Sequence, residues 1–469
     1  MLDILLLATL LQGPPATPDP RAARLLDTAM ARMGGAQALE RIERVRLDML
    51  TQWQRTAFDQ RPYADLPSYE WHVDVRDYAI PAWRNTRRFK LGGVEREVTD
   101  VVRDSVAIRR GPDGKWAPLN VAYVDERREL FTFAVERLLP LARHAPDLRL
   151  LADTTIAGIA HARIAATVDR FPATIFLRRT DGLPAMVRWR APHPNDFGLV
   201  PWGEMDVELW YSNWQRTSAG LALPMQWDVR RVGRPYKRMS VLGVAFDTAA
   251  TADSFAVSDS LRAAFFATAN RPMHDVPFDS ARVAEPGLVD FRSAGAPAGA
   301  VKLGAQWVLL EAGQAPLSAE RAVEWLRRNE PGAKVGGAIV TLVATGNGGA
   351  AWLAGERVPL HLAPGARPFV RTVLRNHRRP EAAATAVTKA GWLRVSGDSL
   401  WLEPIDLPDA PGALLVYAPS LRWVYSATAF MPLHAEYLRA RMRERGWPVE
   451  RIGSMRNVSA PVPPQSASR

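Results

Sequence analysis

The 469-residue chain contains no cysteine. This absence excludes disulfide bonds, thiol nucleophiles, thiolate metal sites and a lipid-modified N-terminal cysteine. Lysine is also scarce, so the net charge of +11 is carried almost wholly by arginine. Because the arginines are spread along every segment, rather than gathered with stacking aromatic residues, the pattern argues against a nucleic-acid partner.

Long apolar runs are missing as well. A short apolar run covers residues 1–11 and ends at Gly13-Pro14-Pro15. It is too short to span a bilayer and resembles a signal peptide over residues 1–18, although Asp3 stands where Lys or Arg is usual. We therefore expect a periplasmic or otherwise exported protein with no transmembrane segment. The alternatives are a mis-assigned start and an N-terminal core strand.

The length of the chain fits two domains of about 200 residues each. We predict an α+β protein with a first domain over residues 19–257 and a second over residues 286–456. Residues 258–285 mix Ser, Asp, Ala and Pro without a sustained period and are predicted to be a linker. The Pro- and Ser-rich residues 457–469 are predicted to be a disordered tail.

The first domain is predicted to be one helix followed by an antiparallel meander. Apolar residues repeat at helical spacing from Asp19-Pro20 until Gly34-Gly35 stops the run. From Val45 to Val257 the period changes to two, with turns at Thr180-Asp181-Gly182 and Ser218-Ala219-Gly220. This order predicts a curved sheet covered by a helix.

A helix that ends in Gly-Gly, followed by strands carrying Asp181-Gly182-Leu183-Pro184 and Gly220-Leu221-Ala222-Leu223-Pro224, resembles the half-barrel of periplasmic lipoprotein-carrier proteins. The resemblance implies a concave face that holds an acyl chain. A concave face must be filled either by side chains or by an apolar ligand. Four aromatic residues are candidates to line it, with plain core packing as the alternative reading: Trp189, Trp210, Tyr211 and Trp227.

The second domain begins with a predicted strand, helix, strand unit. Gln306–Glu311 reads as a buried strand, a helix opens at Ser318, and Ala338–Thr341 reads as another buried strand. Gly348-Gly349 then starts a helix. Further strands are predicted at 358–361, 399–402, 413–419 and 422–425.

This order resembles an αββα metallo-β-lactamase fold over residues 286–456. In that family a His-x-His-x-Asp-His loop precedes the Gly-Gly pair, and it would fall on residues 341–346, where Thr, Leu, Val and Ala stand instead. A zinc site needs three or four imidazole, carboxylate or thiolate donors. The resemblance therefore implies a vestigial cleft without metal or cofactor, at Thr341, Val343, Thr345, Gly346, Asn347, Asp409, Thr428 and Ser454.

No other motif points to catalysis. The eight histidines form no His-x-His pair, and no Gly-x-Ser-x-Gly elbow occurs. Paired arginines at 87–88, 127–128, 178–179 and 230–231 are predicted to be solvated edges, with an anionic headgroup or envelope polymer as the alternative partner.

Three hypotheses remain open. The first is a non-catalytic envelope protein, in which a pseudo-metallohydrolase that binds a partner protein is fused to a half-barrel for an apolar ligand such as a lipid. The second is a metal-independent hydrolase that uses the vestigial cleft through Thr341, Thr345, Asn347, Asp409 or Thr428. The third is a periplasmic carrier of lipid or lipoprotein.

Overall fold

The structure is a computed structural model that describes residues 18–56, 65–91, 93–192, 204–247, 252–270, 281–291, 297–343, 347–407 and 410–462. The predicted signal peptide lies outside these residues except for its last position. The chain divides into two compact units, the first ending at Asn270 and the second continuing from Arg271. Among the described residues, no helix combines the length and apolarity that crossing a membrane requires.

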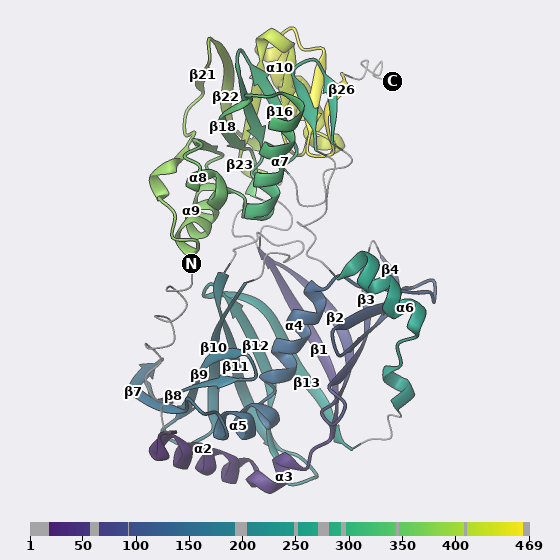
Figure 1. Ribbon diagram of the computed structural model, residues 1–469, viewed down its shortest axis with the longest axis vertical. Coiled ribbons are helices and arrows are strands. Elements are labelled where there is room, and N and C mark those ends of the chain that lie inside the picture. The colour runs from purple at the N-terminus through teal and green to yellow at the C-terminus, as the bar shows by residue number, and fades with distance from the viewer. Residues whose placement is uncertain are drawn as a thin grey trace, which may run out of the picture. The chain divides into compact units, whose positions relative to one another are not determined.

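A 13-stranded antiparallel sheet forms the first unit (Figure 1). Its strand order is β6-β5-β4-β3-β2-β1-β13-β12-β11-β10-β9-β8-β7, so the sheet is open, with β6 and β7 at its edges. The strands are β1 (Arg44–Thr56), β2 (Asp65–Asp77), β3 (Ala82–Leu91), β4 (Val94–Arg103), β5 (Val106–Arg110), β6 (Trp116–Pro118), β7 (Arg149–Ile156), β8 (Ile159–Val168), β9 (Phe171–Arg178), β10 (Pro184–Pro192), β11 (Glu204–Arg216), β12 (Ala222–Arg231) and β13 (Arg234–Phe246).

The predicted N-terminal helix is confirmed as α2 (Pro20–Met33). Asp19 caps it by accepting a hydrogen bond from the Arg21 backbone N–H at 2.8 Å, and Pro20 occupies the first helical position. The helix ends at Gly34, whose φ of +125° is unfavourable for a residue with a side chain. The short helix α3 (Ala36–Glu40) follows.

Two further helices differ from the sequence-based prediction, which places residues 122–143 in the meander. They are α4 (Ala122–Thr132) and α5 (Val135–Arg143), and Figure 1 shows both crossing one side of the sheet. The apolar helical period is weak in α4 because this helix buries the charged side chains of Arg127 and Glu129.

The prediction that residues 258–285 form a linker between the two domains is wrong. Residues 252–270 form η1 (Ala252–Phe255), α6 (Asp259–Ala264) and η2 (Phe265–Ala269), and Phe265 is fully buried in a cluster with residues of β3 to β5. Beyond the undescribed residues 271–280, β14 (Arg282–Glu285) already belongs to a sheet of the second unit. Local composition missed this because the packing partners lie far away in sequence.

Two smaller sheets form the second unit. The seven-stranded sheet contains β14, β15 (Leu288–Asp290), β16 (Gly299–Leu303), β17 (Gln306–Leu310), β18 (Lys334–Val340), β19 (Leu360–Leu362) and β20 (Ala384–Ala386). The six-stranded sheet contains β21 (Gly391–Val395), β22 (Asp398–Leu407), β23 (Ala410–Ala418), β24 (Trp423–Tyr425), β25 (Arg451–Ser454) and β26 (Asn457–Pro461). The helices are α7 (Pro316–Asn329), α8 (Ala350–Gly355), α9 (Arg367–Asn376), η5 (Glu381–Ala383), η6 (Pro419–Leu421) and α10 (Pro432–Glu444).

Helices pack on both sheets of this unit. Val323 of α7 shares one buried cluster with Val308 of β17 and Leu414 of β23, so this core joins the two sheets. Leu438 of α10 packs in a second cluster with Leu415 of β23.

The predicted strand, helix, strand unit is confirmed, because β17 and β18 pair in parallel on either side of α7. Its helix begins at Pro316 rather than Ser318, since proline is well suited to the first helical position. The predicted disordered tail is wrong at its start. Strand β26 pairs antiparallel with β25, and Val458 is fully buried.

Candidate functional site

Of the residues predicted to form the vestigial cleft, the structure describes Thr341, Val343, Asn347, Thr428 and Ser454. The others, Thr345, Gly346 and Asp409, lie outside the described residues. All five described residues are buried. Hydrogen bonds bring three of the segments together. The Ala427 N–H donates to the Thr341 Oγ1 at 3.2 Å, and the Met455 N–H donates to the Ala427 carbonyl at 3.0 Å.

Thr341 is tied to a buried carboxylate that the sequence analysis did not single out. Its hydroxyl donates to Glu311 Oε1 at 2.5 Å, and its backbone N–H lies 3.1 Å from Glu311 Oε2. The Tyr425 hydroxyl donates to the same Oε1 at 3.3 Å. Burial, and then the nearby charge of Glu311, raise the pKa of Tyr425 well above its usual value, so this hydroxyl keeps its proton.

Glu311 is placed by an unusual backbone. Its φ of +66° lies in the left-handed region, and its N–H donates to the Ile339 carbonyl at 2.7 Å across the β17–β18 edge. The only sequence signal for its role was an acidic residue that directly follows a buried apolar strand.

The remaining cleft residues are held by local contacts. The Thr428 Oγ1 lies 2.7 Å from His434 Nδ1, and both side chains are buried. The Asn347 amide donates to the Val343 carbonyl at 3.0 Å, and Ser454 bonds within the β25–β26 turn.

These side chains do not fit a zinc ion. Hydroxyls are poor ligands, and the Thr341 hydroxyl both donates to Glu311 and accepts from Ala427. Over the described part of the chain, no group of three or more His, Asp or Glu residues could hold a metal.

The four aromatic candidates of the first unit separate into two sets. Trp189 lies with its ring centroid 4.3 Å from that of Phe133, and the Tyr211 hydroxyl donates to the Phe133 carbonyl at 2.6 Å. Trp227 contacts the Tyr211 ring edge-on at 6.3 Å. These three therefore pack under the α4–α5 junction. Trp210 points to the other face of the sheet, where it donates to Glu208 at 2.9 Å.

A row of buried polar side chains lies along β2, and the sequence analysis did not predict it. Glu70, His72, Asp74 and Arg76 alternate along β2 and are each at most 5% exposed, whereas Trp71 between them is 53% exposed. A charged-apolar alternation normally predicts the reverse orientation. The sequence therefore shows the alternation along β2, but it does not show which of the two faces of the strand is buried.

Within this row Arg76 pairs with Asp74, and Arg87 of β3 pairs with Glu70. A further buried carboxylate lies nearby on β4. Asp100 of β4 accepts from Arg109 at 2.6 Å, and Arg87 and Arg127 lie near the same carboxylate. Burial opposes its ionisation, but these three guanidinium groups lower the pKa of Asp100. The prediction that Arg87 and Arg127 are solvated edges is thus wrong, and Arg231 is also buried.

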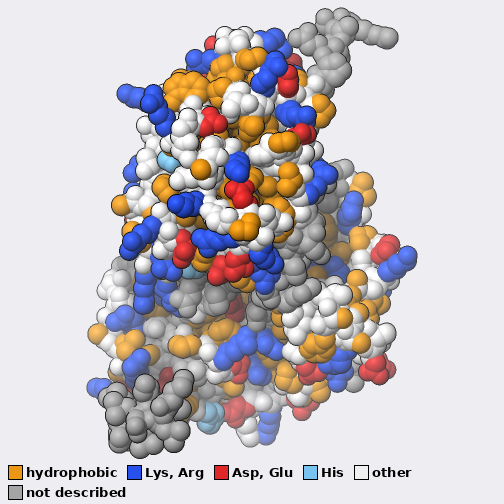
Figure 2. Space-filling view, turned by 45° about the horizontal axis from the view of Figure 1, so that its top comes forward, with side chains coloured by type: hydrophobic (Ala, Val, Ile, Leu, Met, Phe, Trp, Pro, Cys, Tyr) orange, Lys and Arg blue, Asp and Glu red, His pale blue; other side chains and the backbone are white. Residues whose placement is uncertain are grey.

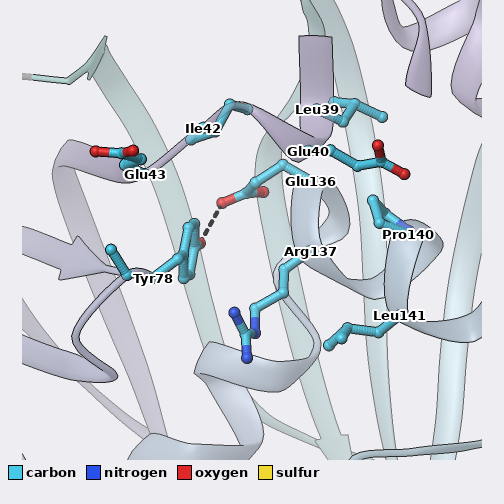
Figure 3. Close-up of a pocket in the computed structure, with 10 residues that line it drawn as sticks. Leu39, Glu40, Ile42, Glu43, Tyr78, Glu136, Arg137, Pro140 and Leu141 are labelled. Atoms are coloured by element: carbon cyan, nitrogen blue, oxygen red, sulfur yellow. Dashed lines mark hydrogen bonds between the residues drawn. The ribbon is translucent and has the colours of Figure 1, made fainter. Parts of the chain in front are cut away.

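A cavity of about 270 Å³ lies between α3, α5 and the β2–β3 turn (Figure 3). Its inner wall carries a hydrogen bond from the Tyr78 hydroxyl to Glu136 Oε1 at 2.7 Å. Burial raises the pKa of Tyr78 well above its usual value, and the Glu136 charge adds to this. The cavity is lined by Leu39, Glu40, Ile42, Glu43, Tyr78, Ala79, Glu136, Arg137, Pro140 and Leu141.

On the face shown in Figure 2, Lys and Arg side chains are dispersed and interleaved with acidic ones. Over the described part of the chain, many arginines pair with neighbouring carboxylates, such as Arg188 with Glu208 at 2.8 Å and Arg179 with Asp153 at 2.7 Å. Surface pairs of this kind contribute little stability but neutralise the charge locally.

No family model and no curated protein matches the chain. Solved structures of both resembled kinds do match it. An outer membrane lipoprotein-sorting protein domain from Vibrio parahaemolyticus is 10% identical, with a TM-score of 0.31, over 50% of this chain and 96% of its own. A DUF1329 family protein from Desulfovibrio piger is 12% identical, with a TM-score of 0.33, over 51% of this chain and 98% of its own.

A metallo-beta-lactamase from Pontibacter korlensis is 11% identical, with a TM-score of 0.27, over 39% of this chain and 85% of its own. At these identities and TM-scores the likenesses assign neither a family nor an activity to the chain.

Proposed function

We propose that this chain is an exported, non-catalytic envelope protein, in which the first unit binds an amphiphilic ligand and the second is a pseudo-metallohydrolase scaffold. The observation that carries the proposal is the bonding of Thr341. Its hydroxyl and N–H are both committed to Glu311, and its oxygen also accepts from Ala427. At Thr341, the first position where a metal ligand would stand, the side chain therefore belongs to an internal hydrogen-bond network.

In the first unit, the feature that supports ligand binding is the cavity beside α5 rather than the four aromatic candidates. Trp189, Tyr211 and Trp227 are at most 3% exposed and pack on Phe133 or on one another, so core packing accounts for them. The cavity beside α5 combines apolar walls with polar groups, as ligand sites generally do.

Metal analysis of the purified full-length protein tests the second unit. We expect far less than one zinc or iron ion per chain, and no rise in the melting temperature when zinc is added after chelation, because a bound metal would stabilise the folded state by mass action. Near-stoichiometric metal that stabilises the fold would overturn the proposal.

A metal-independent hydrolase is the second candidate. The Thr428–His434 contact at 2.7 Å favours it, since a hydroxyl next to an imidazole is the usual arrangement of an activated nucleophile. Against it, both side chains are at most 1% exposed, so a substrate could reach them only after local opening.

A screen of ester, lactam and phosphoester substrates separates the two candidates. Any turnover that Thr428→Val abolishes would favour the hydrolase if it is left intact by Thr372→Val, which removes a hydroxyl of α9 that donates to the Pro368 carbonyl at 3.0 Å. Absence of turnover, or turnover that both variants retain, would remove this candidate.

A further inference from the structure

The cavity beside α5 has two apolar walls that face one another. Leu39 and Ile42 come from α3 and the turn after it, and Pro140 and Leu141 come from the last turn of α5. Figure 3 shows these side chains around a space that opens between the two helical segments. Pro140 contributes its apolar ring to this wall.

One cation lies among the side chains that line this cavity, namely Arg137. Its guanidinium stacks on the rings of Tyr78 and Phe131, with centroid distances of 5.3 and 4.8 Å. Its Nε atom is buried and has no hydrogen-bond partner. Because a buried atom presents no surface to the cavity, a ligand there would meet the terminal N–H groups of this half-buried side chain.

The acidic side chains of the cavity do not neutralise Arg137. Glu136 is 3% exposed and accepts from the Tyr78 hydroxyl, and among the described residues no ion pair joins it to Arg137. Glu40 and Glu43 are exposed at the rim, where solvent and salt screen their charges. The positive charge of Arg137 therefore stays available to a ligand.

The volume limits what can enter. About 270 Å³ corresponds to roughly nine water molecules and lies just below the usual range for sites that enclose a drug-sized ligand. The cavity can hold a head group and a short apolar segment, but not a whole phospholipid.

We propose that this cavity binds a medium-chain amphiphile with an anionic head, such as a carboxylate, whose head accepts hydrogen bonds from Arg137 while its apolar chain lies between Leu39, Ile42 and Leu141. The inference rests on the ligand-binding part of the proposed function and names its ligand class. Arginine suits this role because its planar fork matches a carboxylate.

Calorimetric titration of the full-length protein with decanoate, decanol and decylamine tests the head group. We expect decanoate to bind at one site more tightly than the other two, and more weakly as salt is raised. Arg137→Gln should weaken decanoate binding about ten- to a hundredfold and leave decanol unchanged. Arg143→Gln is the matched control, because Arg143 lies on the same helix but pairs with Asp27 at 2.8 Å outside the cavity.

A second variant covers the case in which Arg137→Gln fails to fold. Leu141→Trp fills the apolar wall without changing charge, and it should block all three probes while circular dichroism stays unchanged. Tighter binding of decylamine or decanol than of decanoate would overturn the anionic head but keep a ligand-binding unit. Failure of all three probes to bind the folded protein would overturn both the inference and the ligand-binding part of the proposed function.

Discussion

The imidazole of His72 lies against the carboxylate of Glu70 within the buried row of β2, with 3.1 Å between Nε2 and Oε2. Burial lowers the pKa of His72 below its usual 6.5. Burial opposes ionisation of Glu70, but the hydrogen bond from His72 and the charge of Arg87 lower its pKa from 4.5 to about 2.

Acid should therefore destabilise the protein in two steps. Below pH 6.5 the unfolded chain protonates His72 more readily than the folded chain does, so stability falls as the pH falls. Between pH 4.5 and 2 the contribution of ionised Glu70, about 3 kcal/mol at most, is lost in the same direction. Urea unfolding followed by tryptophan fluorescence at successive pH values measures this. His72→Gln should flatten the slope between pH 5 and 6.5, and an unchanged slope would refute the assignment.

Removing the hydroxyl of Thr341 should destabilise the second unit. Thr341→Val keeps the shape but leaves Glu311 with one donor fewer in a buried site, at a cost of about 1–3 kcal/mol. Thr341→Ser retains the hydroxyl and should cost less. Denaturant midpoints of the two variants and the parent protein provide the comparison, and equal midpoints would show that the network does not stabilise this edge.

The aromatic residues of the first unit should differ in their contribution to stability. Trp189→Ala empties a site that is 3% exposed against Phe133 and should cost about 3–5 kcal/mol. Trp210→Ala removes one hydrogen bond to Glu208 and a cation–π contact with Arg230, and should cost about 1 kcal/mol. Thermal unfolding of both variants checks the order, and the reverse order would contradict the packing described here.

Gly349 should tolerate no side chain. A Cβ atom there would lie 1.9 Å from the Ala312 carbonyl oxygen, so Gly349→Ala forces α8 away from the segment after β17. We expect a loss of about 1–3 kcal/mol. Gly391→Ala is the control, since nothing lies within 4 Å of a Cβ at that position, and it should change stability by less than about 0.5 kcal/mol. A similar midpoint for both variants would mean that the close approach is not needed.

Much of the local structure was predictable from short-range chemistry. The Asp19-Pro20 start and the Gly34 stop marked α2, and the turn at Asp181-Gly182 separated β9 from β10. The Gly348-Gly349 pair correctly indicated the start of α8. Predictions from these features are correct because capping and turn geometry depend on residues only a few positions apart.

The candidate sites were less predictable. The cleft positions could be named, but Glu311 and His434 could not, because their partners Thr341 and Thr428 meet them only through strand pairing and loop packing. Likewise, nothing near Arg137 in the sequence indicates that α3 and the Tyr78 turn close a cavity around it.

By itself, the sequence determined the absence of thiol chemistry, the period-two strands, and the lack of imidazole and carboxylate donors at most of the cleft positions. Only the tertiary structure decided which face of β2 is buried. A period of two is the same whichever face points inward, and the choice depends on free energy. Glu70 and Asp74 can lie inside because Arg87 and Arg76, brought close by strand pairing and alternation, offset the loss of hydration.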